Sequence, residues 1–181
     1  MDGDVTIHVS QAAVSPNHLN FKPVDPEHFR GVIGRFTSGV TIVSTRSEDL
    51  DFGTTVSACT SISLEPAMIA VCLNRESSTQ KAVLSRGFFG VSILSTAHTD
   101  LAGRFAGKGA GKFNFEPSRG PLGMPLIGGA LAQIECELDD AVSVGTHTLL
   151  IGSVRYAVAS DAEPLAYFRG RFGRFDSSIG E

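Results

Sequence analysis

Small hydroxyl residues gather at two places in this sequence where they could bind a flat, phosphorylated ligand. The run TTVSACTSIS, residues 54–63, would give a planar ring a wall of small side chains and hydroxyl hydrogen-bonding groups. An ordinary Ser- and Thr-rich edge strand is the alternative interpretation. Ser77, Ser78 and Thr79 open a predicted helix, whose free N–H groups and positive dipole end favour an anion. A plain helix cap is the alternative there.

Lysine, histidine and arginine supply further candidates. Lys108 lies in a glycine-rich loop after Phe105 and Ala106, with Lys112 further on, and such a lysine can reach a phosphate as a point charge. His147 enters an apolar strand, where a structural role competes with a functional one. The run YFRGRF, residues 167–172, combines aromatic rings with guanidinium groups that can stack on planar ligands or bind phosphates. The alternative interpretation of that run is a purely structural C-terminal strand that anchors the end of the chain.

Several catalytic motifs are missing from the sequence. No GxGxxG follows a predicted strand, the Gly-Lys pairs at 107–112 do not satisfy the P-loop pattern, and neither GxSxG nor HExxH occurs. The three cysteines form no CxxC pair, so no metal site is expected. Glu135 and Glu137 alternate along a predicted strand, and we interpret them as a solvated face rather than a catalytic pair.

Composition indicates one soluble domain. The chain has 181 residues, of which 42% are hydrophobic and 19% charged, and its net charge of -4 argues against nucleic-acid binding. No run approaches the ~18 apolar residues of a membrane span, and an odd cysteine number favours a cytoplasmic location without membrane association. Residues 1–24 lack periodicity and are predicted to form an N-terminal arm before a domain at 25–181.

The predicted elements are mostly strands. We expect strands at 40–45, 52–63, 67–73, 88–94, 130–138, 148–159 and 165–169. Helices are expected at 26–37, 77–86 and 97–106, with a long loop at 107–129. Asp25 followed by Pro26 and Glu27 is typical of a helix start. Many strands with few short helices predict a mainly β fold, an antiparallel β-barrel with peripheral short helices.

The order of eight sequence blocks resembles the short-chain flavin reductase family, the reductase components of two-component flavin-dependent monooxygenases. The resemblance covers about residues 27–175. It rests on FRGVIGRFTSGVTIVST, GTTVSACTSISLEP, AVCLNRESST, GVSILS, LAGRFAGK, PLIGGALAQIECEL, GTHTLLIG and YFRGRF. It implies a split antiparallel β-barrel of the FMN-binding type, a homodimer with flavin near the subunit interface, and a separate monooxygenase that receives reduced flavin.

The resemblance also implies the site residues. The flavin ring would lie against Thr55, Val56, Ser57 and Ala58, with Gly39 helping to keep its face open. The phosphate would lie near Ser77, Ser78, Thr79, Phe105, Ala106 and Lys108. The nicotinamide side would hold His147, Tyr167, Arg169 and Phe172. The family commonly has Gly-Asp-His at this histidine, whereas Thr146 stands in place of the acid here.

The predicted activity is NAD(P)H:flavin oxidoreduction. FMN or FAD would accept a hydride from NADH or NADPH, and because hydride transfer is the cofactors' own chemistry, no catalytic side chain is expected. Two alternatives remain at this point: a split-barrel flavoenzyme with tightly bound flavin and another substrate, or a non-catalytic flavin-binding electron carrier.

Overall fold

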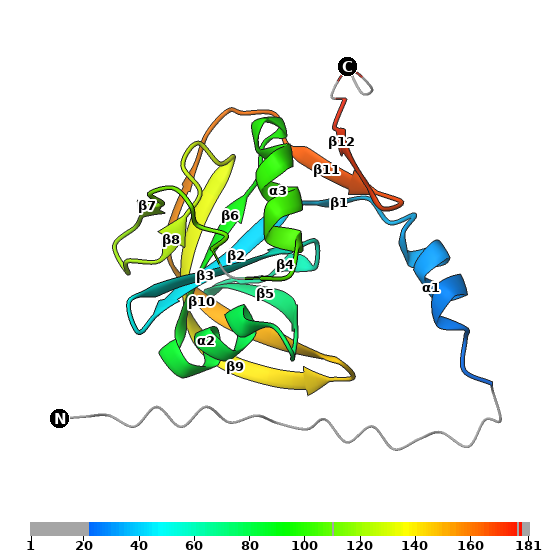
Figure 1. The fold of residues 1–181 in the computed structure, drawn as a ribbon, viewed down its shortest axis with the longest axis horizontal. Coiled ribbons are helices and arrows are strands. Elements are labelled where there is room, and N and C mark those ends of the chain that lie inside the picture. The colour runs from blue at the N-terminus through cyan, green and yellow to red at the C-terminus, as the bar shows by residue number, and fades with distance from the viewer. Residues whose placement is uncertain (1–21, 110, 177, 179–181) are drawn as a thin grey trace.

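The computed structural model describes residues 22–109, 111–176 and 178 (Figure 1). Most of the predicted arm at 1–24 therefore lies outside the described residues. The helices are α1 (Pro26–Ile33), α2 (Ser78–Arg86) and α3 (Thr99–Ala106), with a 3-10 turn at Thr96–His98 before α3. The strands are β1 (Ser38–Gly39), β2 (Thr41–Ser47), β3 (Leu50–Val56), β4 (Cys59–Leu64), β5 (Ala67–Asn74), β6 (Phe88–Ile93), β7 (Ser118–Arg119), β8 (Pro125–Leu126), β9 (Ala132–Val144), β10 (His147–Ala159), β11 (Leu165–Phe168) and β12 (Arg171–Arg174).

A seven-stranded antiparallel sheet forms the body of the molecule, in the order β3-β2-β6-β9-β10-β5-β4. Its two edge strands, β3 and β4, follow one another in the chain with Ser57 and Ala58 between them. Because so short a link spans roughly 10 Å, the two edges must lie close together. β3 also contacts β5, so the sheet curls into a barrel. The prediction of an antiparallel barrel with short peripheral helices is confirmed, but the predicted strand at 52–63 is two strands.

The barrel has a continuous apolar interior and a second core beneath α3. Val43, Phe89 and Leu150 belong to the first cluster, and Ile42 and Phe105 belong to the second. α2 contacts β2 and β3, and α3 contacts the same two strands. A Cβ at Gly53 of β3 would lie 2.6 Å from the Phe105 ring, so glycine is needed there for α3 to approach the sheet. Both helices are therefore held at one edge of the sheet.

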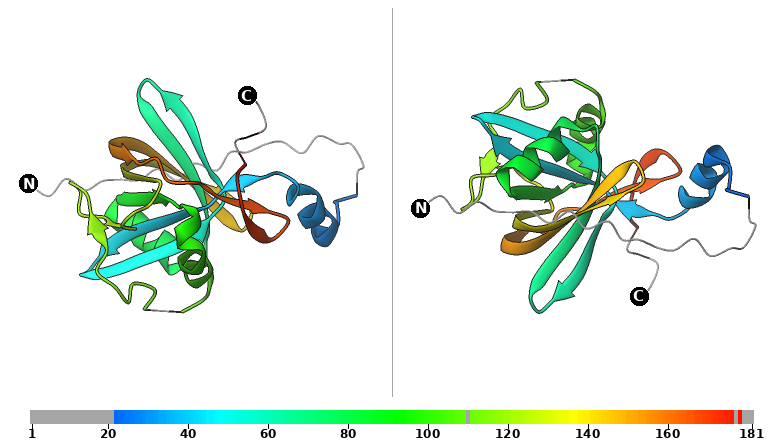
Figure 2. Two further views of the ribbon diagram at one scale, coloured as in Figure 1. Left: turned by 90° about the horizontal axis from the view of Figure 1, so that it is seen from above. Right: turned by 90° about the horizontal axis from the view of Figure 1, so that it is seen from below.

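Helix α1 stands away from the barrel (Figures 1 and 2). The Asp25 carboxylate accepts a 2.8 Å hydrogen bond from the His28 backbone N–H, and Pro26 occupies the first turn, as the sequence predicted. The helix ends at Ile33 rather than at 37. Gly34 follows it, and the chain then extends so that Ser38 and Gly39 pair with β11.

Three other segments differ from their predictions. The predicted strand at 165–169 is one arm of the β11–β12 hairpin, because Arg169 and Gly170 both have positive φ and turn the chain back. The loop at 107–129 contains the short β7–β8 pair. β9 continues to Val144 because a register shift leaves Asp139 outside the pairing and the ladder resumes at Asp140.

Candidate functional site

A cavity of about 890 Å³ lies where α1, the β3–β4 junction and the β11–β12 turn meet. That size is typical of small-molecule sites, which measure roughly 300–1,000 Å³. Its lining includes Arg30 and Phe36 on the α1 side; Ser57, Ala58 and Cys59 at the junction; Ala70, Cys72 and Leu149 from β5 and β10; and Tyr167, Arg169 and Gly170 near the C-terminus. The cavity is therefore built from segments far apart in the sequence.

The cavity joins residues from two of the predicted groups. Ser57 and Ala58, expected against the flavin ring, are exposed and face Tyr167 and Arg169, expected on the nicotinamide side, across the same cavity. Gly39 lies beside this region, because β1 pairs with β11. A second hollow of about 690 Å³ is also lined by Arg169.

The hairpin β11–β12 fixes the aromatic pair at this end of the molecule. Tyr167 pairs with Phe172 across the hairpin, and their ring centroids are 5.7 Å apart with planes inclined at 53°. Both side chains are half-buried, and Phe172 lines the second hollow. A tilted aromatic pair of this kind offers an apolar surface to a planar ligand.

The other two residues of the predicted ring strand are occupied within the protein. The Thr55 hydroxyl donates a 2.7 Å hydrogen bond to the Ala102 carbonyl of α3, and Val56 is buried in the barrel core. A ligand at β3 would therefore meet their backbone more readily than their side chains. The side chains that remain available at this junction are those of Ser57 and Ala58.

The predicted phosphate group is split between α2 and the end of α3. Ser77 precedes α2 and makes no side-chain capping bond within the described part of the chain, while Ser78 is exposed. Thr79 is 2% exposed and Phe105 is fully buried, so neither side chain faces solvent. Ala106 and Lys108 are exposed. α2 and α3 contact the same two strands from opposite faces, because Val43 packs with Val83 of α2 and the adjacent Ile42 packs with Phe105 of α3.

His147 lies at the start of β10, opposite Asn74 of β5. Its Nδ1 is 2.9 Å from the Thr146 hydroxyl, so Thr146 contacts the imidazole from the position where the family commonly has an acid. His147 is absent from the cavity lining, but Leu149 lines it, and alternate residues of a strand share a face. His147 therefore lies on the same sheet face as the cavity, beside the start of α2.

Two kinds of ionisable group near the site have shifted pKa values. Burial raises the pKa of the Cys59 and Cys72 thiols, so the two cysteines that line the cavity are protonated and poor nucleophiles. Burial lowers the pKa of Lys112, whose Nζ donates to the carbonyls of Phe105 (2.8 Å) and Gly53 (3.2 Å).

The sequence did not predict that α1, Cys72 and Leu149 line the cavity. The residue spacing in these segments indicates only a helix and buried strands.

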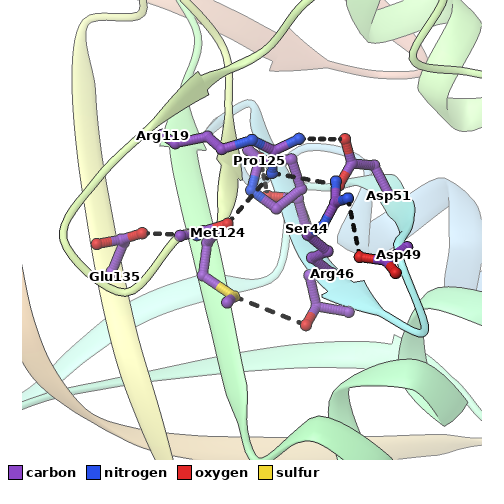
Figure 3. A network of polar contacts seen from close by, with 10 residues as sticks. Ser44, Arg46, Asp49, Asp51, Arg119, Met124, Pro125 and Glu135 are labelled. Atoms are coloured by element: carbon purple, nitrogen blue, oxygen red, sulfur yellow. Dashed lines mark hydrogen bonds and ion pairs between the residues drawn. The ribbon is translucent and has the colours of Figure 1, made fainter.

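The prediction that Glu135 lies on a solvated strand face is wrong. Glu135 is 0% exposed, and its carboxylate accepts hydrogen bonds from the backbone N–H groups of Leu122 (2.9 Å) and Met124 (2.8 Å). Figure 3 shows Glu135 beside Met124. Glu137 is half-exposed, as predicted, and pairs with Arg155 at 2.7 Å. The two carboxylates thus have separate structural partners, because the 118–126 segment covers Glu135.

The same segment is tied to the β2–β3 hairpin by charge. Arg119 pairs with Asp51 at 2.8 Å, and Asp51 also pairs with Arg46 at 3.1 Å (Figure 3). Within residues 22–109, 111–176 and 178, no group of three or more His, Cys, Asp or Glu side chains is placed to hold a metal ion. Nor does any helix in those ranges combine the length and apolar character needed to cross a membrane.

Comparison with known proteins gives a consistent result. The family described as "Flavin reductase like domain" matches residues 33–176. The reductase component of 4-nitrophenol 4-monooxygenase/4-nitrocatechol 2-monooxygenase from Rhodococcus opacus is 38% identical over 154 residues, covering 85% of this chain and 83% of that protein. FMN reductase (NADH) SmoA from Agrobacterium fabrum is 32% identical over 169 residues, covering 92% and 97%.

A comparison with solved structures also finds flavin reductases. NADH:FAD oxidoreductase SgcE6 from Streptomyces globisporus, in complex with NAD and FAD fragments, matches with a TM-score of 0.81 and 30% identity, covering 88% of this chain and 99% of that one. The expected split-barrel fold, the oxidoreductase class and the flavin and nicotinamide cofactors are confirmed at the level of the family. The chain belongs to the flavin reductase family.

Proposed function

We propose that this protein is an NAD(P)H:flavin oxidoreductase that reduces FMN or FAD and supplies the reduced flavin to a separate monooxygenase. The observation that carries the proposal is the shared cavity, which is lined by Ser57 and Ala58 on one side and by Tyr167 and Arg169 on the other. Flavin and nicotinamide must stack for hydride transfer, and one cavity reached by both residue groups allows this.

The residues around the cavity fit a flavin. The flavin supplies the hydride acceptor, and the protein has to bind, orient and shield the two rings. Ser57 and Ala58 carry small side chains that let a flat ring approach the β3–β4 junction. The Tyr167–Phe172 pair supplies aromatic surface nearby, and Arg169 supplies a positive charge for the donor. No side chain is required to transfer a proton.

The phosphate of the flavin is assigned to the start of α2 and the segment at the end of α3. The exposed candidates are Ser78 at the start of α2 and Lys108 after α3, and the Ser77 hydroxyl makes no capping bond within the described part of the chain. Thr79, Phe105 and Ala106 would contribute backbone groups and shape. Backbone N–H groups at a helix start favour an anion, and the lysine adds a formal charge.

His147 is assigned to the nicotinamide side together with Tyr167, Arg169 and Phe172. Its support is its place on the cavity's face of β10, two residues before Leu149. The Thr146 hydroxyl contacts Nδ1 and leaves Nε2 as the nitrogen available to a ligand. An imidazole in this position would shape the donor site or hydrogen-bond to it.

A homodimer is proposed because this chain leaves a large apolar surface uncovered around the cavity. Phe29, Val32, Ile33 and Phe36 of the α1 region are between 52% and 75% exposed. On the β4 edge, Ile62 and Leu64 are 48% and 84% exposed. Monomers rarely expose such a surface, and a second copy would cover it and complete the wall of the cavity.

The domain and the location follow from simpler observations. We assign residues 25–181 to one flavin reductase-like domain and 1–24 to an arm. A cytoplasmic location is supported by three cysteines that are all free thiols. Transfer of reduced flavin to a monooxygenase is supported by the relative from Rhodococcus opacus, which is named as the reductase component of such an enzyme.

A steady-state assay tests the activity and separates it from its alternatives. NADH or NADPH oxidation is measured with FMN or FAD in all four pairings, and saturable turnover of free flavin is expected. A carrier would oxidise no more than one equivalent of donor, and a flavoenzyme with another substrate would retain its flavin without turnover. Either result would overturn the proposal.

A variant pair tests the location of the flavin ring. Ala58→Phe fills the cavity at the β3–β4 junction and should weaken flavin binding and turnover. The matched control is Ala157→Phe, at an exposed position of β10 outside the cavity lining. Equal kinetics in the two variants would place the ring elsewhere.

A further inference from the structure

Lys112 joins the end of α3, which belongs to the proposed phosphate site, to the edge strand β3. Its Nζ donates to the carbonyl of Phe105, near the end of α3, at 2.8 Å and to the carbonyl of Gly53, in β3, at 3.2 Å. The last carbonyls of a helix have no partner within the helix, and the C-terminal end of the dipole attracts a cation. One ammonium group therefore ties the end of α3 to an edge strand of the barrel.

The environment of Lys112 differs from that of an ordinary surface lysine. The side chain is half-buried, and its burial lowers its pKa. Within the described ranges, no carboxylate lies within ion-pair distance of it. The carbonyl oxygens of Phe105 and Gly53 thus stabilise this charge and fix its position.

Aromatic packing fixes the chain on the far side of Lys112. The ring of Phe113 meets the ring of Phe105 edge-to-face, with centroids 4.8 Å apart, and Phe115 packs on Phe113. The Arg104 guanidinium donates to the side-chain carbonyl of Asn114. The segment that leaves the barrel at Ala106 is therefore fixed again at 112–115, with Lys108 between the two attachment points.

We propose that Lys112 is a positioning residue that holds the Phe105–Lys108 segment where it meets the phosphate of the flavin. The inference rests on the phosphate assignment made under the proposed function. Lys112 acts through the backbone at Phe105 and Gly53, so its loss should affect phosphorylated flavins and leave the hydride donor's binding unchanged.

The test compares riboflavin with FMN, since the two share a ring and differ by the phosphate. In Lys112→Met, the Kd for FMN should rise about tenfold, the loss expected for one charge-assisted contact, while the Kd for riboflavin stays within about twofold. The KM for NADH at saturating flavin should not change. Lys112→Arg, which can donate to both carbonyls, should restore most of the FMN affinity. Lys22→Met, at an exposed position before α1, is the matched control for loss of one positive charge.

Lys108→Met separates the inference from the assignment on which it rests. If Lys108→Met weakens FMN binding selectively and Lys112→Met does not, the positioning role is overturned and the phosphate assignment stands. If neither variant changes the ratio of FMN to riboflavin affinity, both are overturned. An equal loss for FMN and riboflavin in Lys112→Met, with a lower Tm, would mean that Lys112 only stabilises the fold. If the methionine variant does not fold, Lys112→Gln takes its place and is judged by the same ratio.

Discussion

The two sides of the barrel differ in how completely one chain satisfies them. On the α3 side, Thr55, Lys112 and Glu135 all bond to backbone groups of neighbouring segments, and the Phe105 ring is fully buried. On the α1 side, the helix contains no buried residue and Phe36 is 75% exposed. On the α3 side, the polar and apolar groups named here have their partners within this chain. On the α1 side, apolar side chains are exposed, and another surface would cover them.

The cavity lies on the boundary between these two sides. Ser57 and Ala58 reach it from the α3 side, directly after β3, and Tyr167 and Arg169 reach it from the α1 side. The comparison therefore predicts two classes of variant: removal of a buried side chain on the α3 side, such as Glu135, should alter the stability of the monomer, and changes on the α1 side should alter assembly and activity.

The largest effect is expected from Glu135→Ala. Removing the carboxylate leaves the backbone N–H groups of Leu122 and Met124 without their acceptor, and at about 1–3 kcal/mol each this should cost roughly 2–6 kcal/mol of unfolding free energy. Urea unfolding checks it. Glu137→Ala, which removes the half-exposed pair with Arg155, should cost no more than about 1 kcal/mol. Equal losses would show that burial of Glu135 is not important.

A large effect on assembly is expected from Phe29→Ser combined with Phe36→Ser. Both side chains are exposed in the single chain, so the unfolding free energy of the monomer should change little. Dimers should dissociate, and turnover should fall at least about tenfold, equivalent to about 1.4 kcal/mol in transition-state stabilisation. Light scattering at micromolar concentration and the NADH assay check both points. A monomeric parent protein with full activity would remove the proposed role of α1.

An intermediate effect is expected at the start of α2. Ser77→Ala with Ser78→Ala should weaken FMN binding by about 1–3 kcal/mol, the range for hydrogen bonds to charged groups, without changing the oligomeric state. Thr79 is left intact because it is 2% exposed and its replacement would disturb packing. Fluorescence titration measures the affinity, and unchanged values for FMN and FAD would exclude this phosphate position.

The smallest effect is expected from His147→Ala. The apparent KM for NADH or NADPH should rise by roughly three- to tenfold, with flavin affinity unchanged, because lost uniform binding raises KM and leaves kcat alone. If instead only the Tm falls and the kinetic constants stay the same, His147 is a packing residue at the start of β10.

Much of the fold could be predicted from local pattern, and the errors have physical causes. Ser57 and Ala58 interrupt a β-prone run because the chain crosses there from one sheet edge to the other, which depends on barrel closure rather than on propensity. The strand predicted to end at 138 continues beyond Asp139, because a bulge leaves this residue unpaired and the ladder resumes after it. The hairpin after Phe168 was hidden because Arg169, a residue with no turn preference, takes positive φ.

The site was predicted residue by residue less completely than the fold. Ser57, Ala58, Tyr167 and Arg169 line one cavity, as a common site requires. The side chains of Thr55 and Phe105 are used up in the packing of α3 on β3 and do not face a ligand. Local residue spacing does not encode this helix–strand packing. Glu135 shows the same limit, since its neighbours come from a segment more than ten residues away in the chain.

The two-residue link at Ser57 and Ala58 has a thermodynamic consequence. It lies at the seam between the two edge strands of the sheet, so a ligand in the cavity contacts the link itself and the start of β4. Separation of β3 from β4 would destroy the binding site. Flavin should therefore lower the population of the open seam by the factor 1 + [L]/Kd. In the cell, the supply of flavin would govern the lifetime of the closed barrel as well as the rate of turnover.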